Sequence, residues 1–62
     1  MKCKELYRLL LKDGWYPISQ KGSHIKMKHV VKKGFIIFPN HENQEIGKNL
    51  EKRIFKAAGI KL

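Results

Sequence analysis

The spacing of apolar residues predicts a helix over residues 2–12. Within it, Cys3, Leu6 and Leu10 fall on one side of the helix, while lysine and arginine occupy the opposite side. Gly14 follows shortly after, and glycine is the usual residue just past a helix C-terminus. Because the apolar side of this helix includes Cys3, the only cysteine in the sequence, we interpret that thiol as a core residue rather than a reactive group.

Residues 15–21 and 24–31 predict two strands joined by a tight turn at Lys21-Gly22-Ser23. Pro17 lies inside the first of these strands. Because proline cannot donate a hydrogen bond to a neighbouring strand, this strand is expected at an edge of the sheet. Residues of the second strand alternate in character, which places Ile25, Met27 and His29 on one face and His24, Lys26 and Lys28 on the other.

A third strand is predicted over residues 35–39, after a turn at Lys32-Lys33-Gly34. This strand is apolar on both faces, so a single layer of helices cannot cover all of its side chains. The pair left outside the core is either Phe35 with Ile37 or Ile36 with Phe38. Such an exposed pair marks an interaction site, unless the chain termini or the loop after the strand cover it.

A second helix is predicted from residue 47 or 48 to residue 58, and Gly59 provides its stop. Its expected apolar stripe consists of Leu50, Ile54, Ala57 and Ala58. The connection before it, residues 40–47, is polar.

The order of elements is therefore helix, three strands, helix, within a single domain over residues 1–62. Connections of only a few residues between strands require antiparallel pairing. Each helix has one apolar stripe, so both should pack on the sheet face that carries Ile25 and Met27. The fold class is α+β, with a three-stranded antiparallel sheet and two helices on one face. The other face would then be cationic and carry His24.

Charge sharpens this picture. The 62 residues carry a formal net charge of +9, with a pI near 10.0. No acidic residue lies between Gly14 and His41, while five lysines do. A field of this sign favours polyanions, among which are nucleic acid, an anionic membrane surface and an acidic protein.

Several function classes lack their usual residues. A lone cysteine provides neither a disulfide nor a zinc–thiolate site and suits a reducing compartment. His24 and His29 should point to opposite sheet faces, so they cannot bind one metal ion together. His41, Glu42 and Glu45 could form a metal site, although a solvated loop is the simpler interpretation. These patterns favour a protein without a metal or cofactor. No apolar run approaches the roughly 20 residues of a membrane span, so we expect a cytoplasmic protein.

What remains is a histidine beside cations, a combination that suits metal-free cleavage of RNA. RNA supplies its own nucleophile, the 2′-hydroxyl, and the protein must transfer protons and stabilise negative charge. Histidine is suited to proton transfer near neutral pH. Here Lys21, Lys26 and Lys28 would hold the backbone, Ser23 would donate a hydrogen bond to a phosphate oxygen, and Gly22 would allow close approach. The residues alone also allow His24 to be an ordinary surface side chain.

The chain resembles the HicA family of bacterial toxins in two long stretches, DGWYPISQKGSHIKMKH and FIIFPNHENQEIGKNLEKRIFKAAGI. The shared features are the first helix ending in Gly14-Trp15, the Gly22-Ser23-His24 motif, Pro39-x-His41 and a last helix ending in Ala58-Gly59-Ile60. The chain departs from the usual family pattern at Glu42 and Asn49, both in or near the connection to the second helix.

The resemblance implies a fold of the double-stranded-RNA-binding-domain type, α-β-β-β-α. It also implies a ribosome-independent mRNA interferase in which the histidine of the Gly-Ser-His motif, here His24, is catalytic. The implied partner is a HicB-type antitoxin that covers the active-site face. His41 is a candidate second proton-transfer group or RNA contact, and otherwise a plain loop residue.

We therefore expect a toxin endoribonuclease in which His24 is the general base or acid. Lys21, Lys26 and Lys28 would position mRNA, with Gly22 and Ser23 beside the phosphate. Trp15 and Tyr16 are the aromatic residues available for base stacking, with Trp15 better placed for the core. The alternative is a non-catalytic basic RNA-binding module of the same fold.

Overall fold

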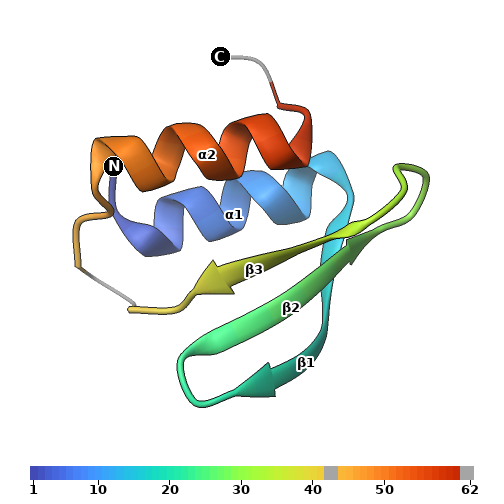
Figure 1. The fold of residues 1–62 in the computed structure, drawn as a ribbon, viewed down its shortest axis with the longest axis horizontal. Coiled ribbons are helices and arrows are strands. Elements are labelled where there is room, and N and C mark those ends of the chain that lie inside the picture. Colours follow the sequence, from blue (N-terminus) through green and yellow to red (C-terminus); the bar gives the residue numbers. More distant parts are fainter. Residues whose placement is uncertain (42–43, 61–62) are drawn as a thin grey trace.

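The protein is described by a computed structural model that covers residues 1–41 and 44–60. The elements along the chain are α1 (Cys3–Asp13), β1 (Trp15–Lys21), β2 (His24–His29), β3 (Phe35–Pro39) and α2 (Lys48–Ala58). The strands form one antiparallel sheet in the order β1-β2-β3. Both helices lie over the same face of this sheet and run side by side in the same direction (Figure 1). The predicted α-β-β-β-α order and antiparallel sheet are confirmed.

The core lies between the helices and the sheet. Ile25 and Met27 of β2 are buried there, and the neighbouring residues of the same strand are not. On β3 the buried pair is Ile36 with Phe38, so Phe35 and Ile37 are the pair that remains exposed. This choice follows from pairing, because Ile36 lies opposite Met27 and shares its face.

The first helix buries the side that its spacing predicted. Cys3, Leu6 and Leu10 are almost completely buried, and Tyr7 and Leu9 are partly buried against the same core. Burying a leucine side chain of this kind contributes about 1.5–3 kcal/mol to the free energy of unfolding. The helix stripe therefore provides a substantial part of the core on the side of β1.

The predicted apolar stripe of α2 is partly wrong. Ile54 and Ala58 are buried as expected, but the third buried residue is Phe55, while Leu50 and Ala57 are exposed. The helix is turned about its axis so that the large phenylalanine ring enters the core. Leu50 and Ala57 consequently face the side of the molecule where β3 ends the sheet.

The edge position of β1 is confirmed. Within the sheet this strand pairs only with β2, and its register shifts between Pro17 and Ser19. The irregularity leaves Ile18 out of the pairing with β2. The second strand ends at His29 rather than at residue 31, because the His29 Nδ1 atom accepts hydrogen bonds from the backbone N–H groups of Val31 and Lys32, both at 2.9 Å.

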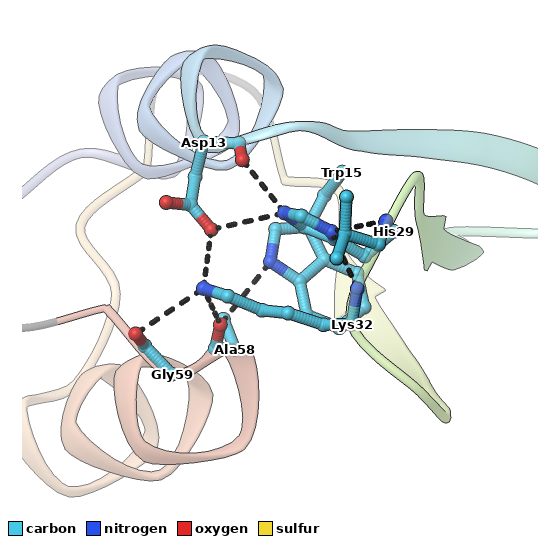
Figure 2. A network of polar contacts seen from close by, with 7 residues as sticks. Asp13, Trp15, His29, Lys32, Ala58 and Gly59 are labelled. Atoms are coloured by element: carbon cyan, nitrogen blue, oxygen red, sulfur yellow. Dashed lines mark hydrogen bonds and ion pairs between the residues drawn. The ribbon is translucent and has the colours of Figure 1, made fainter.

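A network of polar contacts ties together the C-terminal ends of the two helices (Figure 2). The Lys32 ammonium donates to the Asp13 carboxylate at 2.7 Å and to the carbonyl oxygens of Ala58 and Gly59 at 2.8 and 3.2 Å. The Trp15 indole N–H also donates to the Ala58 carbonyl oxygen, at 3.3 Å. One lysine in the β2–β3 connection thus satisfies carbonyl groups at the end of α2 and joins them to the end of α1.

The tight packing around Gly14 predicts a large stability cost for a side chain at that position. Gly14 has a φ of +112°, and a Cβ atom there would lie 2.8 Å from His29 Nε2. Gly34 has a φ of +87° with open space around it, so it is a matched control for backbone strain alone. We expect Gly34→Ala to lower the free energy of unfolding by about 1 kcal/mol and Gly14→Ala by about 2–3 kcal/mol in urea titrations. Equal effects would mean that the contact with His29 is not tight.

The same network predicts a pH-dependent part of the stability. The hydrogen bond from the Lys32 ammonium lowers the pKa of the Asp13 carboxyl below its usual value of 3.8. As the pH falls, the Asp13 carboxylate therefore becomes protonated in the unfolded chain before it does in the folded protein. Its contribution to the free energy of unfolding is complete above pH 3.8 and is lost as the pH falls through the lower folded-state pKa.

We expect Asp13→Asn to lower the free energy of unfolding at neutral pH, and the difference from the wild type to shrink as the pH falls below 3.8. Urea unfolding at a series of pH values measures this. A difference that stays constant with pH would show that the carboxylate charge is not what stabilises the contact.

Candidate functional site

The sheet surface that faces away from the helices carries the candidate catalytic residues. Strand pairing places His24 opposite Lys21 on β1 and Pro39 on β3. Two further rows follow along the sheet, Ser19-Lys26-Ile37 and Tyr16-Lys28-Phe35. We call this surface the open face and define it by Tyr16, Lys21, His24, Lys26, Lys28, Phe35 and Ile37.

His24 is exposed and is the first residue of β2, directly after the two-residue turn formed by Gly22 and Ser23. Gly22 has a φ of +60°, a conformation that glycine adopts at little cost and other residues avoid. The turn is held from both sides. The Gln20 side chain donates to the Gly22 carbonyl oxygen at 3.0 Å, and the Asn40 N–H donates to the Ser23 carbonyl oxygen at 2.6 Å. His24 thus lies at a corner of the sheet, directly after a turn that these hydrogen bonds hold.

Two of the three predicted backbone-binding lysines lie close to this histidine. Lys21 is its direct neighbour across the turn, and Lys26 lies two residues further along the same strand face, about 7 Å away. The third, Lys28, is twice as far along the strand. Lys26 also contacts Phe35, with its ammonium 4.3 Å from the centre of the ring. This cation–π contact holds the lysine over the open face.

His29 lies on the opposite face of β2 from His24, as the strand alternation predicts. Its Nδ1 atom accepts two backbone hydrogen bonds, so the proton of the neutral ring lies on Nε2, which donates to the Asp13 carbonyl oxygen at 2.7 Å. The ring also packs edge-on against Trp15, with 5.1 Å between centroids (Figure 2). His29 therefore stabilises the junction between α1 and the sheet and lies away from the open face.

The third histidine, His41, is exposed and lies just after β3. The Asn40 backbone N–H is hydrogen-bonded to Ser23, in the turn that precedes His24. His41 is the next residue along the chain after Asn40. Of the other residues that a metal site here would need, Glu42 lies outside the described residues. Within the described part of the chain, no group of three histidine, cysteine or acidic side chains is arranged to bind a metal ion.

The two aromatic residues of β1 have separate environments. Trp15 is buried in the core, with only 2% of its surface exposed, so it is not available to stack on a base. Tyr16 is exposed on the open face, directly opposite Lys28.

A comparison with known protein families gives the family of the chain. The family model for the HicA toxin of bacterial toxin–antitoxin matches residues 3–60, from the first residue of α1 to the residue after Gly59. The chain belongs to the HicA toxin family. A search of curated proteins found no match to the chain.

The HicA family consists of toxins of bacterial toxin–antitoxin systems, so membership implies an antitoxin as the partner of this protein. The matched residues contain all five elements of the fold. In the described part of the chain, no helix is long and apolar enough to cross a membrane.

Charge alone does not distinguish the open face of this HicA protein from the rest of its surface. The outward sides of the helices also carry exposed cations at regular four-residue spacing, namely Lys4, Arg8 and Lys12 on α1 and Lys48, Lys52 and Lys56 on α2. What distinguishes the open face is an exposed histidine between lysines, next to a hydrogen-bonded turn.

Sequence analysis missed one surface feature, a groove of about 330 Å³ between β3 and α2. Its lining includes Leu50 and Ala57, which the sequence pattern predicts as core residues. The signal for this groove in the sequence is Phe55, because Leu50 and Phe55 lie on different sides of the helix and only one of them can face the sheet.

Proposed function

We propose that the protein is a metal-independent endoribonuclease toxin that cleaves mRNA at the open face. Family membership supports the toxin role, and the exposed imidazole of His24 between Lys21 and Lys26 is the observation that carries the nuclease proposal. We expect the protein to act in the cytoplasm, where mRNA and its antitoxin are available.

The reaction requires a cation-lined surface and two proton transfers. The 2′-oxygen of the RNA attacks the adjacent phosphorus and forms a P–O2′ bond while the P–O5′ bond breaks. The 2′-hydroxyl gives up a proton, the departing 5′-oxygen takes one, and the products are a 2′,3′-cyclic phosphate and a 5′-hydroxyl. His24 carries out one of these proton transfers as general base or acid, and His41 is the candidate for the other.

Cations stabilise the additional negative charge that develops on the phosphate oxygens during this reaction. Lys21 and Lys26 flank His24 and would contact the reacting phosphate, whereas Lys28 would bind the RNA backbone further from the bond that is cleaved. Ser23 donates a hydrogen bond to a phosphate oxygen, and Gly22 lets the RNA backbone approach the turn. Tyr16 offers a ring for base stacking beside Lys28.

Inhibition follows from the same geometry. A HicB-type antitoxin would cover the open face, with acidic side chains opposite the lysines and apolar side chains against Phe35 and Ile37. Access of RNA to His24 would then be blocked by occupation of the surface rather than by a change in the fold.

The alternative function is a non-catalytic RNA-binding module. The lysines and Tyr16 of the open face would bind RNA equally well if His24 had no chemical role, because phosphate contacts do not require an imidazole. The two functions differ only in what the histidine does, so that residue provides the decisive test.

We expect His24→Ala and His24→Gln to reduce RNA cleavage by about 10²–10⁴-fold, while RNA affinity changes by less than about threefold. Cleavage is followed with a labelled RNA in the presence of EDTA, and affinity by fluorescence anisotropy. His29→Gln serves as a control for fold stability and His41→Ala tests the second transfer. Full cleavage by His24→Ala would support the RNA-binding module, and 5′-phosphate products would contradict the mechanism.

A second prediction separates the open face from the helices. We expect Lys21→Gln/Lys26→Gln/Lys28→Gln to weaken RNA binding and to reduce the slope of log affinity against log salt by about 2, since each phosphate contact on single-stranded RNA contributes about 0.7. The matched control Lys48→Gln/Lys52→Gln/Lys56→Gln removes the same charge from α2. Equal loss of affinity and slope in both variants would mean that RNA is attracted by net charge and not held on the open face.

A further inference from the structure

The outer edge of β3 has no strand partner among the described residues. This strand pairs with β2 on one side only, and the sheet order places it at the edge opposite β1. Unlike β1, it contains no proline before its last residue and no register shift in its pairing. A regular, apolar edge strand of this kind can pair with an extended segment of another chain.

A groove runs along this edge, between β3 and α2. Its apolar lining comes from Ile36 and Ile37 on the strand and from Leu50, Ile54 and Ala57 on the helix, and its volume is about 330 Å³. Arg53 of α2 adds one positive charge to the lining. A strand added beside β3 would direct every second side chain into this groove, below α2, and the others onto the open face.

Two of the exposed apolar residues lie at this edge, on its two sides. Ile37 is 47% exposed on the open face, and Leu50 is 39% exposed on the helix side. An added strand would cover both, since its neighbouring side chains would lie on both sides of the sheet. The surface is thus apolar where a fourth strand would bury it and charged beyond that.

We propose that an extended segment of the antitoxin adds to β3 as a fourth, edge strand. Its inward side chains would be mainly apolar and fill the groove, with one acid that pairs with Arg53, and its outward side chains would include acids that pair with lysines of the open face. β3 has five residues, so about five residues of the partner would suffice. This inference rests on the proposed function only in naming the antitoxin as the partner.

Charge and chemistry favour this occupant over others. A second copy of the chain would bring two proteins of net charge +9 together with Arg53 and the open-face lysines near the contact. RNA would place phosphates against an apolar groove that offers them one arginine. An antitoxin segment with alternating acidic and apolar residues complements the charge, the apolar lining and the free backbone groups at once.

The consequence is an attachment site for the antitoxin outside the catalytic residues. His24 is paired with Pro39 at one end of β3. The added strand on the other side of β3 would therefore bring the partner near His24, although the strand itself need not contact the histidine. Loss of this attachment should therefore release inhibition and leave cleavage intact.

The test uses Leu50→Glu/Ala57→Glu, which places two carboxylates in the groove, and the matched control Leu11→Glu/Val31→Glu, which changes two exposed apolar residues elsewhere. The probe is the antitoxin encoded beside the toxin gene, with affinity measured by calorimetry and folding by circular dichroism. We expect the groove variant to bind the antitoxin on the order of 100-fold more weakly and the control to stay within about threefold. RNA cleavage by both variants alone should equal that of the wild type.

Hydrogen exchange provides the second measurement, since pairing must protect amides of β3. We expect exchange at alternate β3 residues to slow when the wild-type complex forms. Unchanged exchange there, wild-type affinity in the groove variant, or no binding of the antitoxin to the wild type would overturn the proposal. Self-association of the free toxin that the groove variant abolishes would overturn it in favour of a second copy. A failure of RNA cleavage alone would count only against the nuclease function.

Discussion

Burial of both helices on one face of a three-stranded sheet is the constraint on which the rest of the structure depends. A chain of 62 residues has enough apolar side chains for one core, and that core lies between the helices and the face carrying Met27 and Phe38. The opposite face therefore has no cover in the described structure. Strand alternation then places His24 and Lys26 on that uncovered surface, so the site is a direct result of how the core is formed.

The two histidines of β2 show how strand parity places one side chain towards the helices and the other on the open face. His29 faces the helices, and its two ring nitrogens are used in backbone hydrogen bonds that end the strand and join it to α1. His24 faces outward at a turn that is held by Asn40 and Gln20. A difference of five positions places these identical side chains on opposite faces, which makes one a packing residue and leaves the other accessible to a substrate.

Sequence reasoning predicted the elements, their order and the faces of β2, because these depend on local periodicity and on turn residues. It could not choose between the two pairs of β3, since a strand that is apolar on both faces has no internal signal; pairing with β2 decides that choice. The rotation of α2 was missed because Leu50 and Phe55 are both acceptable core residues. The role of Lys32 was also hidden, as its partners Asp13 and Ala58 are 19 and 26 positions away.

The central claim is that RNA is bound and cleaved on the open face beside His24. The most direct measurement is NMR mapping of the toxin with an RNA oligonucleotide whose 2′-hydroxyls are methylated, because this RNA can bind but cannot react. We predict that the largest changes in chemical shift occur at His24, Lys26 and the Gly22 turn. Changes centred on the outward sides of α1 and α2, around Arg8 and Lys52, with His24 unaffected, would contradict the claim.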